Sequence, residues 1–408
     1  MTAAEPSHTD TVTWLRLART KGLGPVGLAR LMAQYDCADA ALDALPSRLR
    51  KAGRPQSGIP ARDRIEAELD AIERAGARLL IPADPDYPSM LAAIPAPPPA
   101  LTCFGDVSLA AAPCCAMVGA RNASAAGLRF AGEIARELGE NGVSIVSGLA
   151  RGIDGAAHRG ALETGTIAVL AGGIDHIYPP EHDELHRAIA RGGLVLSERP
   201  LGCVPTARDF PRRNRLISGL SLGTLVIEAA LRSGSLISAR FAAEQGREVM
   251  AVPGSPMDPR ARGSNQLLRD GAHLVETADD VLRILADAAR TISHRPAPRG
   301  LADGAQPDTV GDLFDDGPDR EACCPGQDIC DPENGVGDAS APGTGVCEDD
   351  PVERVATLLS PTPVSADTLA RHAGLPAGLL NAVLMELEMC GRLARLPDGQ
   401  VQLSQPAS

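Results

Sequence analysis

Six short apolar segments between residues 115 and 252 constrain the fold most, because helical patterns lie between and after them. We expect strands at Cys115–Gly119, Val143–Ser147, Ile167–Ala171, Gly193–Ser197, Thr224–Ile227 and Glu248–Val252. The expected helices are Ala125–Glu140, Ile153–Leu162, Glu181–Ala190, Arg213–Ser218, Leu236–Gln245 and Asn265–Asp270. Strands that are apolar throughout are buried on both faces, and regular alternation with helices favours parallel pairing. The sequence therefore predicts an α/β fold with an extended, doubly wound, mostly parallel, Rossmann-like sheet.

The rest of the chain divides around this central region. Helical periodicity marks residues 1–78, and a proline-dense connector over 79–100 leads into the α/β domain at 101–290. Residues 291–350 are acidic and of low complexity, and we expect disorder there because few apolar residues offset the entropy of ordering. Helical periodicity returns over 351–408. We therefore expect three folded domains joined by one short and one long linker.

The net charge of −13 does not by itself exclude a nucleic-acid partner. Residues 301–350 hold fourteen Asp or Glu and one Arg, which accounts for the whole imbalance. The remainder carries 38 basic and 38 acidic residues, so a local basic surface is possible there. Only 2% of the residues are aromatic, so a binder that stacks bases would have few rings to use.

Neither metal binding, secretion nor membrane insertion is indicated. The ten cysteines are dispersed, and Cys323, Cys324, Cys330 and Cys347 lack the paired spacing of zinc ligands. The N-terminal ten residues contain no apolar signal segment, and no apolar run approaches the roughly 18 residues of a membrane span. We expect a cytoplasmic protein with reduced cysteines, no cofactor and no membrane partner.

Glycine-rich or polar segments follow the expected strands. They are Gly119–Ala125, Ser147–Asp154, Gly172–Gly173, Ser197–Glu198, Ser233–Ser235 and Val252–Gly254. Doubly wound sheets bind ligands at the carboxyl ends of their strands, where glycine lets backbone amides approach a ligand and helix N-termini attract anions. Hydroxyl and guanidinium donors also lie there, at Ser124, Ser147, Ser235, Arg121, Arg151, Arg212, Arg213 and Arg215. Several phosphate sites along one edge suit a polymer better than a mononucleotide.

Each of these features also has a purely structural interpretation. A glycine turn can simply be a tight connection, and Arg212 and Arg213 can be solvated residues at a helix start. Arg215 can pair with Glu198, and Asp154 can be a first-turn residue favoured by the helix dipole. Glu228 is the most enzyme-like carboxylate, although it can equally pair with an arginine. The residues alone leave these alternatives open.

Several long blocks resemble the DNA-processing protein A family, also called Smf. They are SGLARGID at Ser147–Asp154, Gly172–Asp175 with Tyr178-Pro179, FPRRNRLISGLS at Phe210–Ser221, SGSLISA at Ser233–Ala239, EQGREVMAVPG at Glu244–Gly254, and GSNQLLRDGA at Gly263–Ala272. The resemblance implies a single-stranded DNA-binding recombination mediator that protects incoming DNA and loads RecA during natural transformation. It also implies a homodimer. The DNA-facing positions it implies are Arg121, Ser147, Gly148, Arg151, Gly152, Asp154, Arg212, Arg213, Asn214, Arg215, Gly234, Ser235 and Asn265.

The flanking regions resemble the family's accessory domains. Gly22–Gly27 fits the turn of a sterile-alpha-motif-like or helix-hairpin-helix domain, where a plain helical turn is an equal alternative. Residues 352–403 resemble a winged helix whose expected third helix, Pro376–Cys390, has two glutamates and no Lys or Arg. Duplex binding needs phosphate neutralisation, so we expect this domain to contact protein, or to touch DNA weakly through Arg392 and Arg395, rather than to read DNA strongly.

Two other functions compete with DNA binding. One is a Rossmann-type nucleotide phosphoribohydrolase, because Ser221–Glu228 partly matches a GGxGTxxE motif but places Ser221 and Leu222 at its paired glycines. The other is a regulatory adaptor that recruits partners through the winged helix. No P-loop, metal cluster or Ser–His–Asp arrangement is visible, so we expect no catalytic residues and no enzyme activity.

Overall fold

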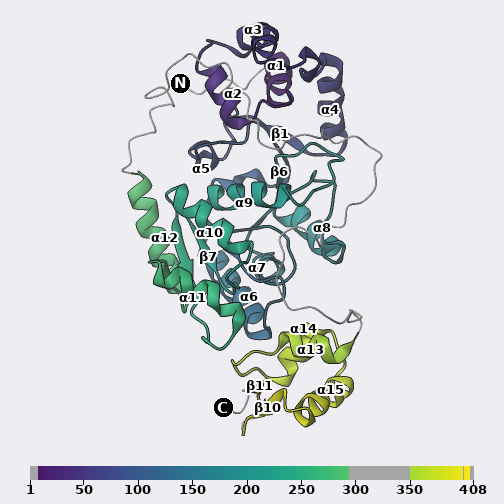
Figure 1. Cartoon of the computed structure of the whole chain (residues 1–408), viewed down its shortest axis with the longest axis vertical. Coiled ribbons are helices and arrows are strands. Elements are labelled where there is room, and N and C mark those ends of the chain that lie inside the picture. Colours follow the sequence, from purple (N-terminus) through teal and green to yellow (C-terminus); the bar gives the residue numbers. More distant parts are fainter. Residues whose placement is uncertain (1–7, 294–349, 398, 405–408) are drawn as a thin grey trace.

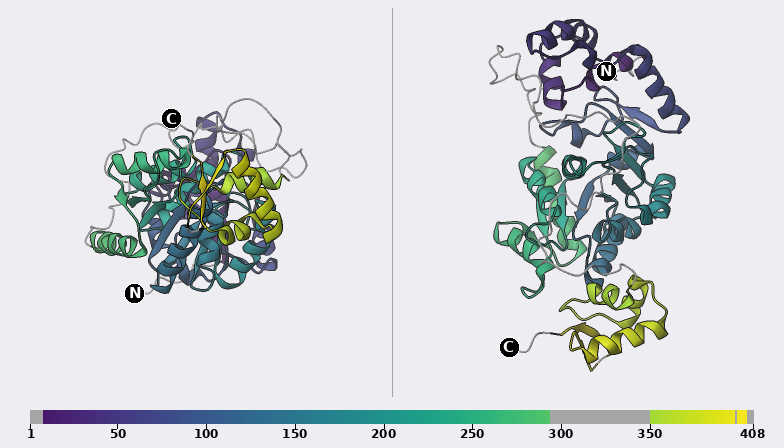
Figure 2. Two further views of the ribbon diagram at one scale, coloured as in Figure 1. Left: turned by 90° about the horizontal axis from the view of Figure 1, so that it is seen from below. Right: turned by 45° about the vertical axis from the view of Figure 1, so that its right-hand side comes forward.

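The computed structural model describes residues 8–293, 350–397 and 399–404. In Figure 1 the N-terminal helices lie at one end of an elongated molecule, the α/β domain fills the middle, and a small domain lies at the other end. The views in Figure 2 show the same order along the long axis. The expected disorder over 291–350 falls almost wholly outside the described residues, and the four clustered cysteines lie outside them.

The N-terminal domain is a small helical bundle. It contains α1 (His8–Ala18), α2 (Pro25–Met32), α3 (Ala38–Lys51), a short 3-10 turn at Gln56–Gly58 and α4 (Arg62–Arg74). Its core is built from leucines, among them Leu17, Leu31 and Leu45. The Trp14 indole donates to the carbonyl of Pro99 at 2.6 Å, and Arg19 donates to the carbonyl of Glu198 at 3.3 Å. These bonds fasten the bundle to the sheet domain.

The central sheet has nine strands in the described residues. They are β1 (Arg78–Leu80), β2 (Leu101–Gly105), β3 (Cys114–Val118), β4 (Ser144–Ser147), β5 (Thr166–Val169), β6 (Leu194–Ser197), β7 (Gly223–Val226), β8 (Glu248–Ala251) and β9 (His273–Leu274). The spatial order is β1-β2-β6-β5-β4-β3-β7-β8-β9, parallel from β6 to β9. The six strands expected from sequence are confirmed as β3 to β8, with ends shifted by at most two residues.

The first two strands were not expected from the sequence. β1 pairs antiparallel with β2, and β2 pairs antiparallel with β6, so they extend the parallel sheet at one edge. The stretch expected to be a connector, 79–100, therefore starts inside a strand and also carries α5 (Ser89–Ala92). The sequence did not indicate β1, because the neighbouring prolines argue against a strand. Its three residues form one only by pairing with the distant β2.

Helices cover both faces of the sheet. One face packs against α6 (Ala125–Glu140), α7 (Ile153–Gly160), α8 (Asp183–Gly192) and α12 (Ala278–Ser293). The other packs against α9 (Asp209–Leu220), α10 (Ser235–Glu244) and α11 (Arg262–Arg269). The helix expected at Arg213–Ser218 begins earlier, at Asp209, whose carboxylate accepts from the Thr206 amide and hydroxyl at 2.8 and 2.7 Å.

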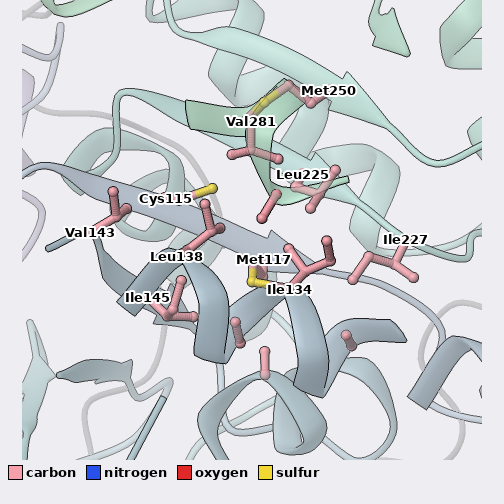
Figure 3. Close-up of a cluster of buried hydrophobic side chains, with 14 of the residues drawn as sticks. Cys115, Met117, Ile134, Leu138, Val143, Ile145, Leu225, Ile227, Met250 and Val281 are labelled. Carbon is pink, nitrogen blue, oxygen red and sulfur yellow. The ribbon is translucent and has the colours of Figure 1, made fainter. Parts of the chain in front are cut away.

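Successive side chains of a strand point to opposite faces of the sheet, so each strand contributes to the apolar core on both faces. In β3, Cys115 and Met117 point to the α6 side, whereas Cys114, Ala116 and Val118 point to the α9 side. Figure 3 shows Met117 and Cys115 among Ile134, Leu138 and other apolar side chains of that half. Burial raises the pKa of Cys114 to about 12, so its thiol is unreactive at neutral pH.

The C-terminal domain is the expected winged helix. It consists of α13 (Pro351–Leu358), α14 (Ala366–Ala373), α15 (Ala377–Met389), β10 (Leu393–Arg395) and β11 (Val401–Leu403). The two strands pair antiparallel, and Val364 bridges to Val401. In the ranges that the structure describes, no helix has the length and apolarity needed to cross a bilayer, and no cluster of potential metal ligands occurs.

Candidate nucleic-acid interface

The strand order reverses between β3 and β7, and doubly wound sheets bind their ligands at the carboxyl ends of the strands at such a point. In a dinucleotide-binding sheet the helix N-terminus at this point holds phosphate. Here the carboxylate of Glu228, just after β7, accepts from the Ser124 amide at 2.9 Å and from its hydroxyl at 2.5 Å. A side chain at Gly127 would collide with the same carboxylate. The anion position at the start of α6 is thus occupied by the protein itself.

This arrangement bears on the phosphoribohydrolase hypothesis. Glu228 pairs with a helix start, not with an arginine, and its carboxylate is bonded through both oxygens. Ser124 in turn accepts from the Gly127 amide at 3.0 Å as the N-cap of α6. A carboxylate held this way stabilises the β3–α6 connection, and no described feature favours a catalytic role for it.

Two buried side chains of opposite charge, Arg213 and Asp154, hold the next strand ends together through backbone hydrogen bonds. Arg213 of α9 donates through Nη1 to the carbonyls of Gly148 and Val169 at 2.5 and 2.6 Å. Asp154, in the first turn of α7, accepts from the amides of Gly148 and Ala150 at 3.1 and 3.4 Å. Both charged side chains are at most 7% exposed. These bonds tie α9 and α7 to the ends of β4 and β5.

The electrostatics of this pair follow from its burial. Burial raises the pKa of the Asp154 carboxyl, and Arg213 and the two amide bonds oppose that effect. Burial also lowers the pKa of Arg213 to about 10, Asp154 opposes this, and nearby Arg121 lowers it further. The positive charges of Arg121 and Arg213 therefore disfavour each other, and the buried Asp154 carboxylate opposes this effect at Arg213. An additional anion beside Arg121 would be stabilised by this field.

The glycines of the SGLARGID block serve close packing of the protein itself. Any side chain at Gly148 would overlap the Arg213 guanidinium. Gly152 has a φ of 74°, and an added Cβ would lie 2.1 Å from the carbonyl oxygen of Ala120. Only glycine fits both requirements at position 152. The loop after β4 is thus shaped by contacts with β3 and α9.

Exposed arginines surround this rigid centre. They come from the loops after β3, β4, β6 and β7 and from the start of α9, and they are Arg121, Arg151, Arg208, Arg212 and Arg232. Arg151 also forms an ion pair with Glu181 at 2.8 Å. Sequence reasoning missed Arg208 and Arg232, because neither lies in a glycine-rich motif. Their position in loops that follow β6 and β7 was the available signal.

Two of the few aromatic rings lie on the same surface. The Tyr178 and Phe210 rings meet edge to face with centroids 5.6 Å apart, and the Arg121 guanidinium lies 5.8 Å from the Phe210 centroid. Both rings are half-buried. The low aromatic content argued against stacking, yet the fold gathers these rings beside the exposed arginines. We call Arg121, Tyr178, Phe210 and Arg212 the ring–arginine surface.

The remaining predicted residues are engaged within the protein. Arg215 forms a bidentate pair with Glu198, both bonds at 2.6 Å, as its structural interpretation required. The Ser147 hydroxyl is fully buried and donates to the Met117 carbonyl, and the Ser235 hydroxyl bonds with Ser233.

The two asparagines also have protein partners. The Asn265 amide exchanges two hydrogen bonds with the Gly254 backbone, at 3.1 and 2.9 Å. Asn214 is half-buried and donates to the carbonyl of exposed Gly234 at 3.4 Å. Asn214 follows Arg212 by two residues in α9, whereas Asn265 belongs to α11.

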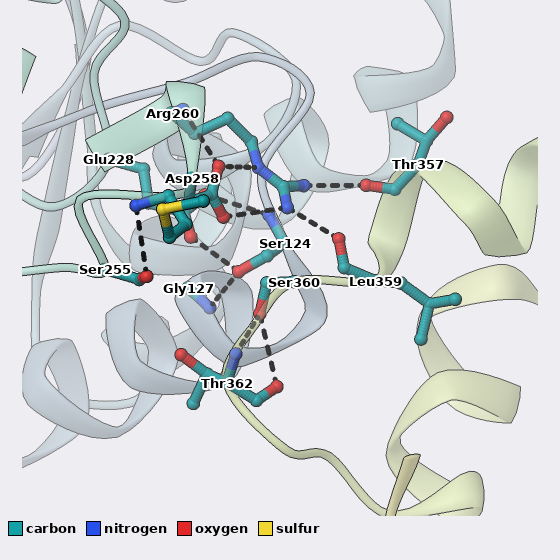
Figure 4. Close-up of polar contacts among 11 residues, drawn as sticks. Ser124, Gly127, Glu228, Ser255, Asp258, Arg260, Thr357, Leu359, Ser360 and Thr362 are labelled. Atoms are coloured by element: carbon teal, nitrogen blue, oxygen red, sulfur yellow. Dashed lines mark hydrogen bonds and ion pairs between the residues drawn. The ribbon is translucent and has the colours of Figure 1, made fainter. Parts of the chain in front are cut away.

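Arg260 fastens the winged helix to the α/β domain (Figure 4). Its guanidinium pairs with Asp258 and donates to the carbonyls of Thr357 and Leu359 at 2.7 and 2.6 Å, at the end of α13. Ala125, the first residue of α6, belongs to the apolar core of the winged helix. The C-terminal domain therefore packs on the helix whose N-terminus Glu228 and Ser124 organise.

Comparisons with known proteins match all three domains. The sequence model of the DNA recombination-mediator protein A family matches residues 78–286, a DprA-like N-terminal HHH domain matches 8–71, and a DprA winged helix domain matches 339–399. Protein Smf of Escherichia coli is 36% identical over 402 residues, which cover 97% of this chain and 96% of that protein. DNA processing protein DprA of Streptococcus pneumoniae is 44% identical over 201 residues, 49% of this chain and 71% of that one.

A solved structure agrees with these matches. The X-ray structure of DNA processing protein A from Streptococcus pneumoniae superposes with a TM-score of 0.59 at 31% identity, and the match covers 69% of this chain and 98% of that one. Because the sequence match to the Escherichia coli protein spans nearly the whole length of both, the three domains occur in the same arrangement along the chain. The chain belongs to the DNA recombination-mediator protein A family.

Proposed function

We propose that this protein binds single-stranded DNA along the carboxyl edge of its sheet, without cleaving it. The observation that carries the proposal is the Tyr178–Phe210 ring pair beside Arg121. Rings stack on bases that are unpaired and unstacked, which a duplex does not offer. The chain's family, the DNA recombination-mediator protein A family, supports the same class of ligand.

The exposed arginines would supply the phosphate contacts. Arg121, Arg208, Arg212 and Arg232 come from three separate loops and the start of α9, so they can follow a polymer backbone. Arg213 has no such role in our proposal, because its guanidinium is buried on the carbonyls of Gly148 and Val169. It positions the turn after β4 and the start of α9, and so holds Phe210 and Arg212 in place.

We expect the arginines and the ring of this surface to contribute differently to binding. In the Arg121→Ala/Arg212→Ala variant the salt dependence of the binding constant should flatten by about 1.4 units, because each single-strand phosphate contact contributes about 0.7. In Phe210→Leu the affinity should fall about fivefold or more while the salt slope stays unchanged, since stacking involves no counterion release. Fluorescence anisotropy of a labelled single strand and its duplex across salt concentrations measures both effects.

The control is Arg136→Ala, which removes an exposed arginine of α6 paired with Glu140 at 3.8 Å. It lies three turns into α6, away from the strand ends, and should leave both affinity and slope unchanged. Duplex binding as tight as single-strand binding would contradict the proposal. So would an Arg136→Ala effect equal to that of the double variant.

We further propose that the protein protects incoming single-stranded DNA during natural transformation and hands the bound strand to the RecA recombinase. We also propose that it acts in the cytoplasm as a homodimer. Support comes from family membership and from β9, whose two residues, His273 and Leu274, are exposed at the open edge of the sheet. Adding the protein to single strands covered by a single-strand-binding protein should accelerate RecA assembly, measured as DNA-dependent ATP hydrolysis. No acceleration, or a monomer in analytical ultracentrifugation, would refute the corresponding part.

A further inference from the structure

Helix α15 of the winged helix is apolar on both of its sides. Its inner side contributes Leu380, Val383, Leu384 and Leu387 to the domain core. Its outer side carries Leu379, Met385 and Met389, which are 43%, 62% and 79% exposed. These three positions, with exposed Ala382 between them, recur at helical spacing. A helix with apolar residues on two sides normally has both sides covered, and no described part of the chain covers the outer stripe.

The way the winged helix docks leaves this stripe open. The contacts to the α/β domain come from the end of α13, through Arg260, and from α14, which packs on α6. In Figure 1 and in the right-hand view of Figure 2, α15 lies on the side of the domain away from the α/β sheet. The docked arrangement therefore presents Met385 and Met389 to solvent rather than to the DNA-binding edge.

The charged residues around the apolar stripe restrict the kinds of partner that can cover it. Helix α15 contains no Lys or Arg, and exposed Glu386 and Glu388 flank the methionines. The nearest following cations are already paired, Arg392 with Glu353 at 2.7 Å and Arg395 with Glu388 at 2.8 Å. A nucleic acid would meet carboxylates instead of cations. The acidic stretch 301–350 of the same chain and a second copy of α15 would both bring like charge.

We propose that the α15 stripe is a docking surface for an amphipathic helix of a partner protein whose apolar face is flanked by basic residues. Methionine side chains are flexible and polarisable, and they adapt to the ridges of an incoming helix. Glu386 would face the partner's Lys or Arg residues at the rim and select against acidic helices, whereas Glu388 is already paired with Arg395. This function is separate from DNA binding and does not depend on it.

The experiment uses the full-length protein and a synthetic probe. The probe is a labelled peptide of about five helical turns, made of leucine and lysine with the leucines on one face. A second peptide replaces each lysine by glutamate. Binding is measured by fluorescence anisotropy for the native protein, for Met385→Ser/Met389→Ser, and for the matched control Met257→Ser. Met257 is 61% exposed but lies in the loop after β8, outside the winged helix.

The native protein and Met257→Ser should bind the lysine peptide with equal affinity, and the double variant should bind at least about tenfold more weakly. The glutamate peptide should not bind. Unchanged binding by the double variant, or equal binding of the two peptides, would overturn the proposal. A change in oligomeric state on making the double variant, measured by sedimentation, would show that a second copy covers the stripe and would also overturn it. Circular dichroism checks folding, which exposed Met-to-Ser changes should preserve.

Discussion

Replacing Arg213 by alanine is expected to lower the free energy of unfolding by about 3–5 kcal/mol, because it removes two buried hydrogen bonds from a charged donor, which contribute about 1.5–3 kcal/mol each. The change leaves the Gly148 and Val169 carbonyls without the donor that now reaches them. It also removes a positive charge whose field opposes the effect of burial on the pKa of the Asp154 carboxyl. Urea unfolding followed by circular dichroism measures the effect. Tryptophan fluorescence would not, because the single tryptophan, Trp14, lies in the N-terminal domain.

The adjacent arginine provides the control. Arg212 is exposed, and Arg212→Ala should change the free energy of unfolding by less than about 1 kcal/mol while weakening DNA binding. Adding Asp154→Asn to Arg213→Ala should recover part of the lost stability, because no charged carboxylate is then left unpaired. Equal losses in Arg212→Ala and Arg213→Ala would show that the buried pair does not stabilise the strand ends.

Acid should destabilise the protein through His158. This ring is fully buried in α7, and its Nδ1 lies 2.7 Å from the Thr166 hydroxyl oxygen. The Thr166 hydroxyl donates to the Ile145 carbonyl, so it accepts a hydrogen bond from His158 Nδ1, which carries the hydrogen of the neutral ring. The other ring nitrogen, Nε2, has no partner among the described residues. Burial lowers the pKa of His158 to about 3, with further lowering by His182 and Arg213. The folded protein therefore holds this ring neutral.

The sign and size of the pH effect follow from this pKa. The folded-state value lies below the unfolded value of about 6.5, so the stabilisation is fully present above pH 6.5 and is lost as pH falls toward 3. Between pH 7 and pH 4 this group alone should remove about 3 kcal/mol. Urea unfolding at both values should show a smaller pH effect in His158→Leu and His158→Gln, which cannot titrate there. An unchanged pH dependence in both variants would contradict the assignment.

Both predictions concern groups that position helices α7 and α9. His158 belongs to α7, the helix whose first turn carries Asp154, and Arg213 contributes to lowering its pKa. Helices α7 and α9 are thus positioned by buried polar groups that have few alternatives. The exposed arginines and the Tyr178–Phe210 pair are presented from this rigid base. A preorganised surface of this kind loses little entropy when it binds a flexible strand.

Much of the fold followed from the sequence. The apolar segments and the helical patterns between them located the ends of β3 to β8 to within two residues. This was possible because strands buried on both faces are apolar throughout, and the intervening helices are long enough to show helical periodicity. Local patterns also predicted the helices of the C-terminal domain, whereas the winged helix itself was predicted from the family resemblance. β1 and β2 were not, because they depend on antiparallel pairing between residues that a proline-rich stretch separates.

The site was predicted only in part, since motifs identify a place in the chain but not the direction of each side chain. The sequence by itself determined that arginines, serines and glycines gather at the carboxyl edge of a parallel sheet. Only the tertiary structure decided that Arg212 faces solvent while Arg213, one residue on, is buried, because successive residues of a helix point about 100° apart. It also decided that two rings of a ring-poor chain meet beside Arg121, a contact that joins two loops and the start of α9 and therefore has no local signature.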